Sequence, residues 1–243
     1  MGLWRHREFV KLWAASAISD FGSEVSALAL PLIAALTLGA TSWQMGLLSA
    51  AATAPILLVG LFAGVWVDRV RRRPVMVVAD LARAALLLVI PLASALGVLR
   101  IELLYVVALL VGSFTVLFDV AHLAFVPFLV DRGQLVEGNS KLEATWSMAK
   151  VAGPGVGGVL VSLLGAPLAV VVDALSFVGS AAFLGRIRAP EGPPVAASER
   201  RGVRAEIARH VEHVDGQEHV AEQVRRGRAS REHPEGAMPE DEA

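Results

Sequence analysis

Four ionisable residues lie inside long apolar runs of this sequence, where a charged side chain is costly. Asp20 and Glu24 are four residues apart, and Asp119 and His122 are three apart, so each pair would share one face of a helix. A carboxylate in a low-dielectric cavity binds a proton more readily than in water, and histidine titrates near neutral pH. We therefore expect Asp20, Glu24, Asp119 and His122 to handle protons and a ligand. The alternative is that Asp20 and Glu24 lie near an aqueous mouth and only hydrate it, and that His122 forms a hydrogen bond to one carbonyl.

The composition places these residues in a membrane. Of 243 residues, 55% are hydrophobic and 19% are charged, whereas soluble domains are about a quarter charged. The apolar residues end near residue 188, and the rest is rich in Arg, Glu, His, Gly and Pro. This predicts a transmembrane bundle over 1–188 and a polar, disordered cytoplasmic tail over 189–243. The absence of cysteine excludes disulfides, thiolate metal sites and cysteine nucleophiles.

The elements that must position the four residues are membrane helices. A span needs about 20 mostly apolar residues. Six segments qualify, and basic residues gather in alternate connections between them, which predicts that both termini are cytoplasmic. The expected fold is an all-α, multi-pass protein of the cell membrane with spans at 9–38, 43–67, 74–98, 101–128, 141–165 and 167–187.

The connection between the second and third segments carries a family motif. Its sequence GVWVDRVRRR resembles the signature loop Gly-x-x-x-Asp-Arg-x-Gly-Arg-Arg of the major facilitator superfamily, with Arg71 in place of one glycine. The stretch GPGVGG at 153–158 is similar to an element of that superfamily's antiporters. Three further stretches, FDVAHLAFVPFLV, LVEGNS and VVDALSFVGSAAF, resemble its drug and siderophore exporter branch, which includes macrolide-efflux and enterobactin-exporter proteins.

This resemblance implies roles for both motifs and a six-helix half of a two-half transporter. In the family the first and fourth helices line the central cavity, and the loop acts as a conformational latch through charge pairing. The loop could instead only obey the positive-inside rule and attract anionic lipid. The glycine element would seal or flex its helix, although close packing alone would explain it. The loop residues are Gly64, Asp68, Arg69, Arg72 and Arg73; those of the glycine element are Gly153, Pro154, Gly157 and Gly158.

Other buried ionisable residues have structural explanations. Asp80 and Arg83 are three apart and are expected to pair with each other. Lys150 could neutralise a cavity carboxylate. Asp173 shares a stripe with Ser176 and Ser180, which predicts a polar packing seam.

The expected function is proton-coupled export of small amphipathic molecules, such as drugs or siderophores, by alternating access. The expected partners are the bilayer, the substrate, the proton, and a second six-helix half or a second copy. We expect no nucleic acid, cofactor or metal, and no enzyme activity, because Asp119 and His122 lack further ligands or a nucleophile motif. The alternative is a truncated or non-transporting module that needs a second half or assists assembly, since the composition changes abruptly near residue 200.

Overall fold

The fold is helical throughout the part of the chain that the structure, a computed structural model, describes: residues 2–67 and 69–189. The predicted tail lies outside this part from residue 190 on. Two short turns, Leu3–Arg5 and Arg132–Gln134, precede α1 and α6, and a wide turn, Ile33–Thr37, continues α1. Seven α-helices follow one another in the described residues: α1 Arg7–Leu32, α2 Ser42–Leu58, α3 Gly60–Val67, α4 Arg72–Ala95, α5 Ile101–Leu129, α6 Leu135–Leu164 and α7 Ala166–Gly185.

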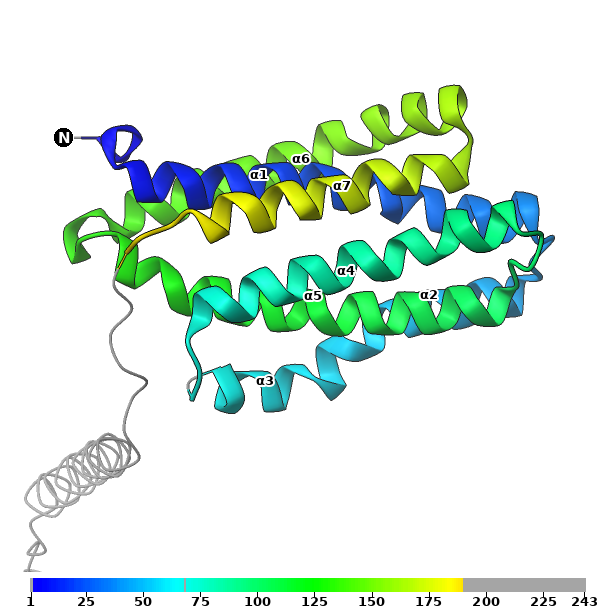
Figure 1. The fold of residues 1–243 in the computed structure, drawn as a ribbon, viewed down its shortest axis with the longest axis horizontal. Helices are drawn as coiled ribbons and strands as arrows, with labels where there is room; N and C mark the ends of the chain where they lie inside the picture. Colours follow the sequence, from blue (N-terminus) through cyan, green and yellow to red (C-terminus); the bar gives the residue numbers. More distant parts are fainter. Residues whose placement is uncertain (1, 68, 190–243) are drawn as a thin grey trace, which may run out of the picture. The chain divides into compact units, whose positions relative to one another are not determined.

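The helices of the bundle form two layers (Figure 1). In one layer α1 packs against both α6 and α7, and in the other α5 packs against α4 and α2. The layers are joined mainly where α4 meets α7, whereas α5 makes only sparse contact with α1 and α6. Helix α5 therefore lies mostly apart from the α1–α6 pair.

Apolar side chains cover the outside of the bundle as well as its interior. Leu57, Phe62, Val151 and Leu163 are more than half exposed, as suits surfaces that face lipid. Five helical segments are long and apolar enough to cross a membrane among the described residues: Arg7–Thr37, Arg72–Ala95, Ile101–Leu129, Arg132–Leu164 and Ala166–Gly185.

The second of the six predicted spans, 43–67, is not one helix, so the prediction of a single membrane helix there is wrong. Helix α2 ends at Leu58 and α3 begins at Gly60. Pro55 cannot donate a backbone hydrogen bond, and glycine disfavours helix, so the two residues flank a weak point. With 17 residues, α2 by itself is shorter than the about 20 that a span needs.

Helix α6 begins at Leu135, six residues before the predicted start of its span at 141. The added turns carry the polar sequence LVEGNS. Apolarity marks only the stretch of a helix that lies in lipid, and a helix continues past that stretch wherever its backbone hydrogen bonds allow. Residue 141 is thus where the apolar stretch begins, and the helix itself begins earlier.

Helices α1 and α7 approach each other closely at Gly22. A Cβ at Gly22 would overlap the Ser176 hydroxyl and lie 2.6 Å from Asp173 Oδ1. Ser176 Oγ donates to Asp173 Oδ1 at 3.1 Å, and Asp173 is buried. These two residues belong to the polar stripe that the sequence predicts, and the missing side chain of Gly22 makes room for them.

Replacing Gly22 by alanine should destabilise the bundle. The added methyl group must push α1 away from α7, at a cost of roughly 1–3 kcal/mol. The melting temperature of the purified chain in detergent measures the effect. Gly155→Ala is the matched control, because a Cβ there meets nothing within 4 Å. Equal melting temperatures for the two variants would contradict the close crossing.

Candidate functional site

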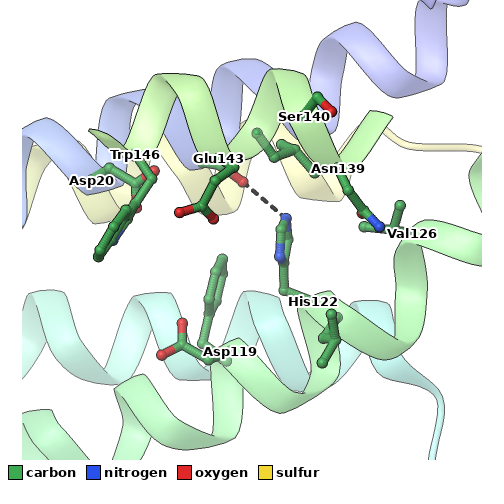
Figure 2. A pocket seen from close by; sticks show the side chains of 12 residues that line it. Asp20, Asp119, His122, Val126, Asn139, Ser140, Glu143 and Trp146 are labelled. Carbon is green, nitrogen blue, oxygen red and sulfur yellow. Dashed lines mark hydrogen bonds between the residues drawn. The ribbon is translucent and has the colours of Figure 1, made fainter. Parts of the chain in front are cut away.

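A cavity of about 590 Å³ lies where α5 diverges from α1 and α6 (Figure 2). Its volume is within the range of about 300–1,000 Å³ typical of small-molecule sites. Helix α1 contributes only polar side chains to the wall, whereas α5 and α6 each contribute polar and apolar ones. The polar members are Ser16, Asp20, Asp119, His122, Asn139, Ser140 and Glu143.

Three of the four predicted site residues meet in this cavity. Asp20 comes from α1, and Asp119 and His122 come from successive turns of α5. At 1.5 Å per residue, Asp20 lies roughly 20 Å from the start of α1 and Asp119 roughly 15 Å from the end of α5. The two carboxylates therefore occupy similar depths, measured from the same end of the bundle.

His122 is held by a side chain of α1 and not by a carbonyl. Its Nε2 lies 3.1 Å from Ser16 Oγ, and its ring stacks on that of Phe118 with centroids 5.9 Å apart. Ser16 is one helical turn before Asp20, so the same face of α1 supplies both residues. The contact between Ser16 and His122 ties α1 to α5 across one end of the cavity.

Helix α6 contributes a wall that the sequence analysis missed. Asn139, Glu143 and Trp146 line the cavity, and Figure 2 shows Glu143 on the wall opposite Asp119. Their spacings of four and three residues place them on one helical face, a signal that was readable in the sequence. Glu143 escaped notice because a glutamate near the end of an apolar segment resembles an ordinary solvated residue.

Glu24, the fourth predicted site residue, does not line the cavity. It forms an ion pair with Lys150 of α6, at 2.6 Å between Oε1 and Nζ. Lys150 was predicted to neutralise a cavity carboxylate, but the carboxylate that it pairs with does not border the cavity. The Glu24 side chain is only 11% exposed, whereas that of Lys150 is 51% exposed. Glu24 therefore lies inside the α1–α6 interface, and Lys150 reaches it from the edge.

The glycine element lets α6 approach α1 at this point. A Cβ at Gly153 would lie 2.6 Å from Glu24 Cγ, and one at Gly157 would lie 3.3 Å from a Cα of α1. A Cβ at Gly158 would meet nothing within 4 Å, and α6 continues as one helix through Pro154. Close packing thus explains Gly153 and Gly157, and a gating role for the element stays a prediction.

Asp80 and Arg83 form a buried ion pair within α4, which confirms the predicted local pairing. The guanidinium carbon of Arg83 lies 4.5 Å from the ring centroid of Phe118 and 4.1 Å from that of Phe177. Arg83 Nη1 also donates to Thr115 Oγ1 at 3.4 Å. Because Phe118 lines the cavity, the ion pair supports the cavity wall from behind.

The predicted latch loop is described in part. Asp68 lies outside the described residues. Arg69 is exposed, and a Cβ at Gly64 would meet nothing within 4 Å. Arg72 is buried, with its guanidinium carbon 4.7 Å from the ring centroid of Phe128 at the end of α5.

Two cations hold the end of α7. Arg73 Nε donates to the carbonyl of Leu184 at 2.9 Å, and Arg73 Nη2 donates to that of Gly185. Lys11 Nζ of α1 donates to the carbonyl of Arg186 at 2.8 Å. Cations at a helix C-terminus satisfy its free carbonyls and its dipole, so Arg73 attaches α4 to α7.

Replacing Lys150 by glutamine should destabilise the bundle more than replacing both members of the pair. The single change leaves Glu24 in the interface without its countercharge, whereas Lys150→Gln with Glu24→Gln leaves two neutral amides. Contacting pairs of this kind couple by about 0.5–3 kcal/mol, with the lower end suited to the exposed Lys150. A double-mutant cycle of melting temperatures in detergent measures the coupling. Additive effects would show that the pair does not join the helices.

Comparison with known proteins places the chain in a family. Residues 12–229 match the model of the Major Facilitator Superfamily. Multidrug efflux pump Tap of Mycolicibacterium fortuitum is 29% identical over 156 residues, 62% of this chain and 38% of that protein. Uncharacterized MFS-type transporter YfiS of Bacillus subtilis (strain 168) is 26% identical over 183 residues, 75% of this chain and 43% of that protein.

These matches cover most of this chain, and the matched region is less than half the length of each curated relative. The family consists of transporters and not of enzymes. A multi-pass helical bundle with a polar cavity between helices agrees with that class. The chain belongs to the major facilitator superfamily.

Proposed function

We propose that this chain forms the N-terminal half of a proton-coupled exporter that moves small amphipathic molecules by alternating access. The observation that carries the proposal is the cavity, in which Asp20, Asp119 and His122 meet beside apolar side chains. The similarity to a protein named as a multidrug efflux pump supports the direction of transport and the class of cargo. The drug exporter branch is favoured on the same ground.

The proposal of proton coupling is supported by the lack of ion pairs at the cavity acids. Among the described residues, Asp20, Asp119 and Glu143 form no ion pair, while the nearby Lys150 and Arg83 each have a carboxylate partner. A carboxylate that binds either a proton or the cargo, but not both together, exchanges one for the other. Such competition couples an inward proton flow to export, because each ligand shifts the same equilibrium.

The pathway needs a second set of helices. Superfamily transporters place the substrate between two six-helix halves, and the cavity described above belongs to one set. We propose that a second six-helix half, or a second copy of this chain, completes the pathway. Proton and cargo would then reach the cavity from opposite sides of the membrane as the two halves rock.

We also propose that the basic end of the bundle is cytoplasmic, together with both termini. Basic residues gather at one end of the bundle, in or beside the α3–α4 and α5–α6 connections and the end of α7: Arg69, Arg71, Arg132 and Arg186. At the opposite end, Arg100 is the one basic residue among those that the structure describes. The positive-inside rule assigns the basic end to the cytoplasm. Residues Val126 and Asn139 of the cavity then lie on its cytoplasmic side.

Cysteine labelling tests this orientation directly, because the chain has no cysteine of its own. Arg71→Cys and Val98→Cys each introduce one exposed thiol, at opposite ends of α4. A membrane-impermeant maleimide should label Val98→Cys in intact cells and Arg71→Cys only after permeabilisation. The reverse pattern would place the basic end outside and refute the orientation.

Replacing Asp20 or Asp119 by asparagine should reduce proton-driven efflux to background. Asparagine keeps the shape of the side chain but cannot release a proton. Efflux from proteoliposomes under an imposed pH gradient measures the effect, with the chain supplied alone and together with a second half. Glu102→Gln is the control, because Glu102 is an exposed carboxylate in the first turn of α5, away from the cavity.

The outcomes separate the roles of the acids. A variant that keeps the pH dependence of the unaltered chain removes its residue from the coupling mechanism. If the unaltered chain gives no proton-dependent flux, either alone or with a second half, then the transport proposal fails and a non-transporting module is favoured.

A further inference from the structure

Three carboxylates border the cavity, and one bound proton would neutralise only one of them. We propose that its cargo is an amphipathic organic cation, and that Glu143 of α6 and Asp119 of α5 bind the positive charge from opposite walls. The inference rests on the proposed function, because it names the cargo of the same cavity. It disfavours the anionic siderophores that the sequence resemblance also suggested.

The first step is the charge of the lining. Three carboxylates border the cavity, those of Asp20, Asp119 and Glu143, and no Lys or Arg borders it among the residues that the structure describes. The remaining ionisable member, His122, shares its Nε2 with Ser16. An anionic cargo would therefore add like charge to an acidic site, whereas a cationic cargo would balance it.

The second step is that the nearest cations are already paired. Lys150 lies 2.6 Å from Glu24, and Arg83 is paired with the buried Asp80. Neither cation is therefore available to balance the cavity acids one for one. The three cavity carboxylates have no ion pair or hydrogen bond within the described part of the chain. Unbalanced charge beside lipid is costly, and a bound cation offsets that cost.

The third step is the apolar part of the wall. Phe118, Leu123, Val126, Leu142 and Trp146 give the cavity more apolar than polar surface. The two aromatic rings already face protein cations, since Arg83 lies 4.5 Å from the Phe118 centroid and Lys150 Nζ lies 5.5 Å from that of Trp146. The rings therefore supply surface for an apolar cargo body, and the carboxylates recognise its charge.

The geometry selects Glu143 as the contact from α6. Its side chain points into the cavity opposite Asp119 in Figure 2, and the residue is exposed. Asp20 comes from the third wall, that of α1. A cation between Glu143 and Asp119 would meet one acid from each layer of the bundle. Binding would then draw α5 and α6 together where they make little direct contact.

A pair of ions with the same shape and opposite charge tests the inference. Tetraphenylphosphonium and tetraphenylborate share a shell of four phenyl rings, so any difference between them reports charge. The assay is equilibrium binding of radiolabelled tetraphenylphosphonium to the purified full chain in zwitterionic-lipid nanodiscs, with empty nanodiscs subtracted. We expect saturable binding of the cation and no competition by tetraphenylborate.

Substitutions assign the site within the same assay. Glu143→Gln should weaken tetraphenylphosphonium binding by about tenfold or more, because one unit charge near the cation is lost. Glu143→Asp should retain part of the affinity, and Glu102→Gln should bind like the unaltered chain. Each variant is first shown to melt at the unaltered temperature, so that a loss of binding reports the site and not the fold.

Three results would overturn the inference: equal competition by tetraphenylborate, no binding of tetraphenylphosphonium, or unaltered binding by a folded Glu143→Gln variant. The proposed function fails separately. Proton-driven efflux of a neutral amphipathic compound without cation binding would keep the exporter and reject its cationic cargo. Saturable, Glu143-dependent cation binding without any proton-driven flux would keep the site and reject the exporter.

Discussion

The cost of placing charge next to lipid governs the interior of this bundle. Buried ionisable groups need a partner or an aqueous space, and the chain uses both solutions. Asp80 and Arg83 pair within one helix, and Glu24 and Lys150 pair between two. Asp20, Asp119 and Glu143 instead border the cavity and form no ion pair among the described residues, and for that reason a proton or a cation is expected there.

Close helix contacts at glycines set the orientation of α1, on which the cavity depends. Lipid gives helices little hydrophobic reason to associate, so small residues and packing must hold them together. Gly22 brings one face of α1 against α7, and Gly153 and Gly157 bring α6 against another. With two faces occupied, α1 turns the remaining face, that of Ser16 and Asp20, toward α5.

The ion pairs beside the cavity belong to its construction and not to its chemistry. Arg83 contacts the ring of Phe118, whose ring in turn stacks on His122. Lys150 lies one turn beyond Trp146 and holds α6 to α1 through Glu24. Each pair joins a cation to its own carboxylate, so neither cation forms an ion pair with a cavity carboxylate.

The sequence by itself determined what depends on neighbours along the chain. The apolar runs marked the membrane helices. A spacing of three residues placed Asp119 with His122 and Asp80 with Arg83, because residues three apart lie on the same face of an α-helix. Tertiary structure decided the rest: that α2 ends before α3, that Glu24 pairs with Lys150 outside the cavity, and that Glu143 enters it. Distances between helices depend on how all of them pack together, and no spacing within a single helix specifies them.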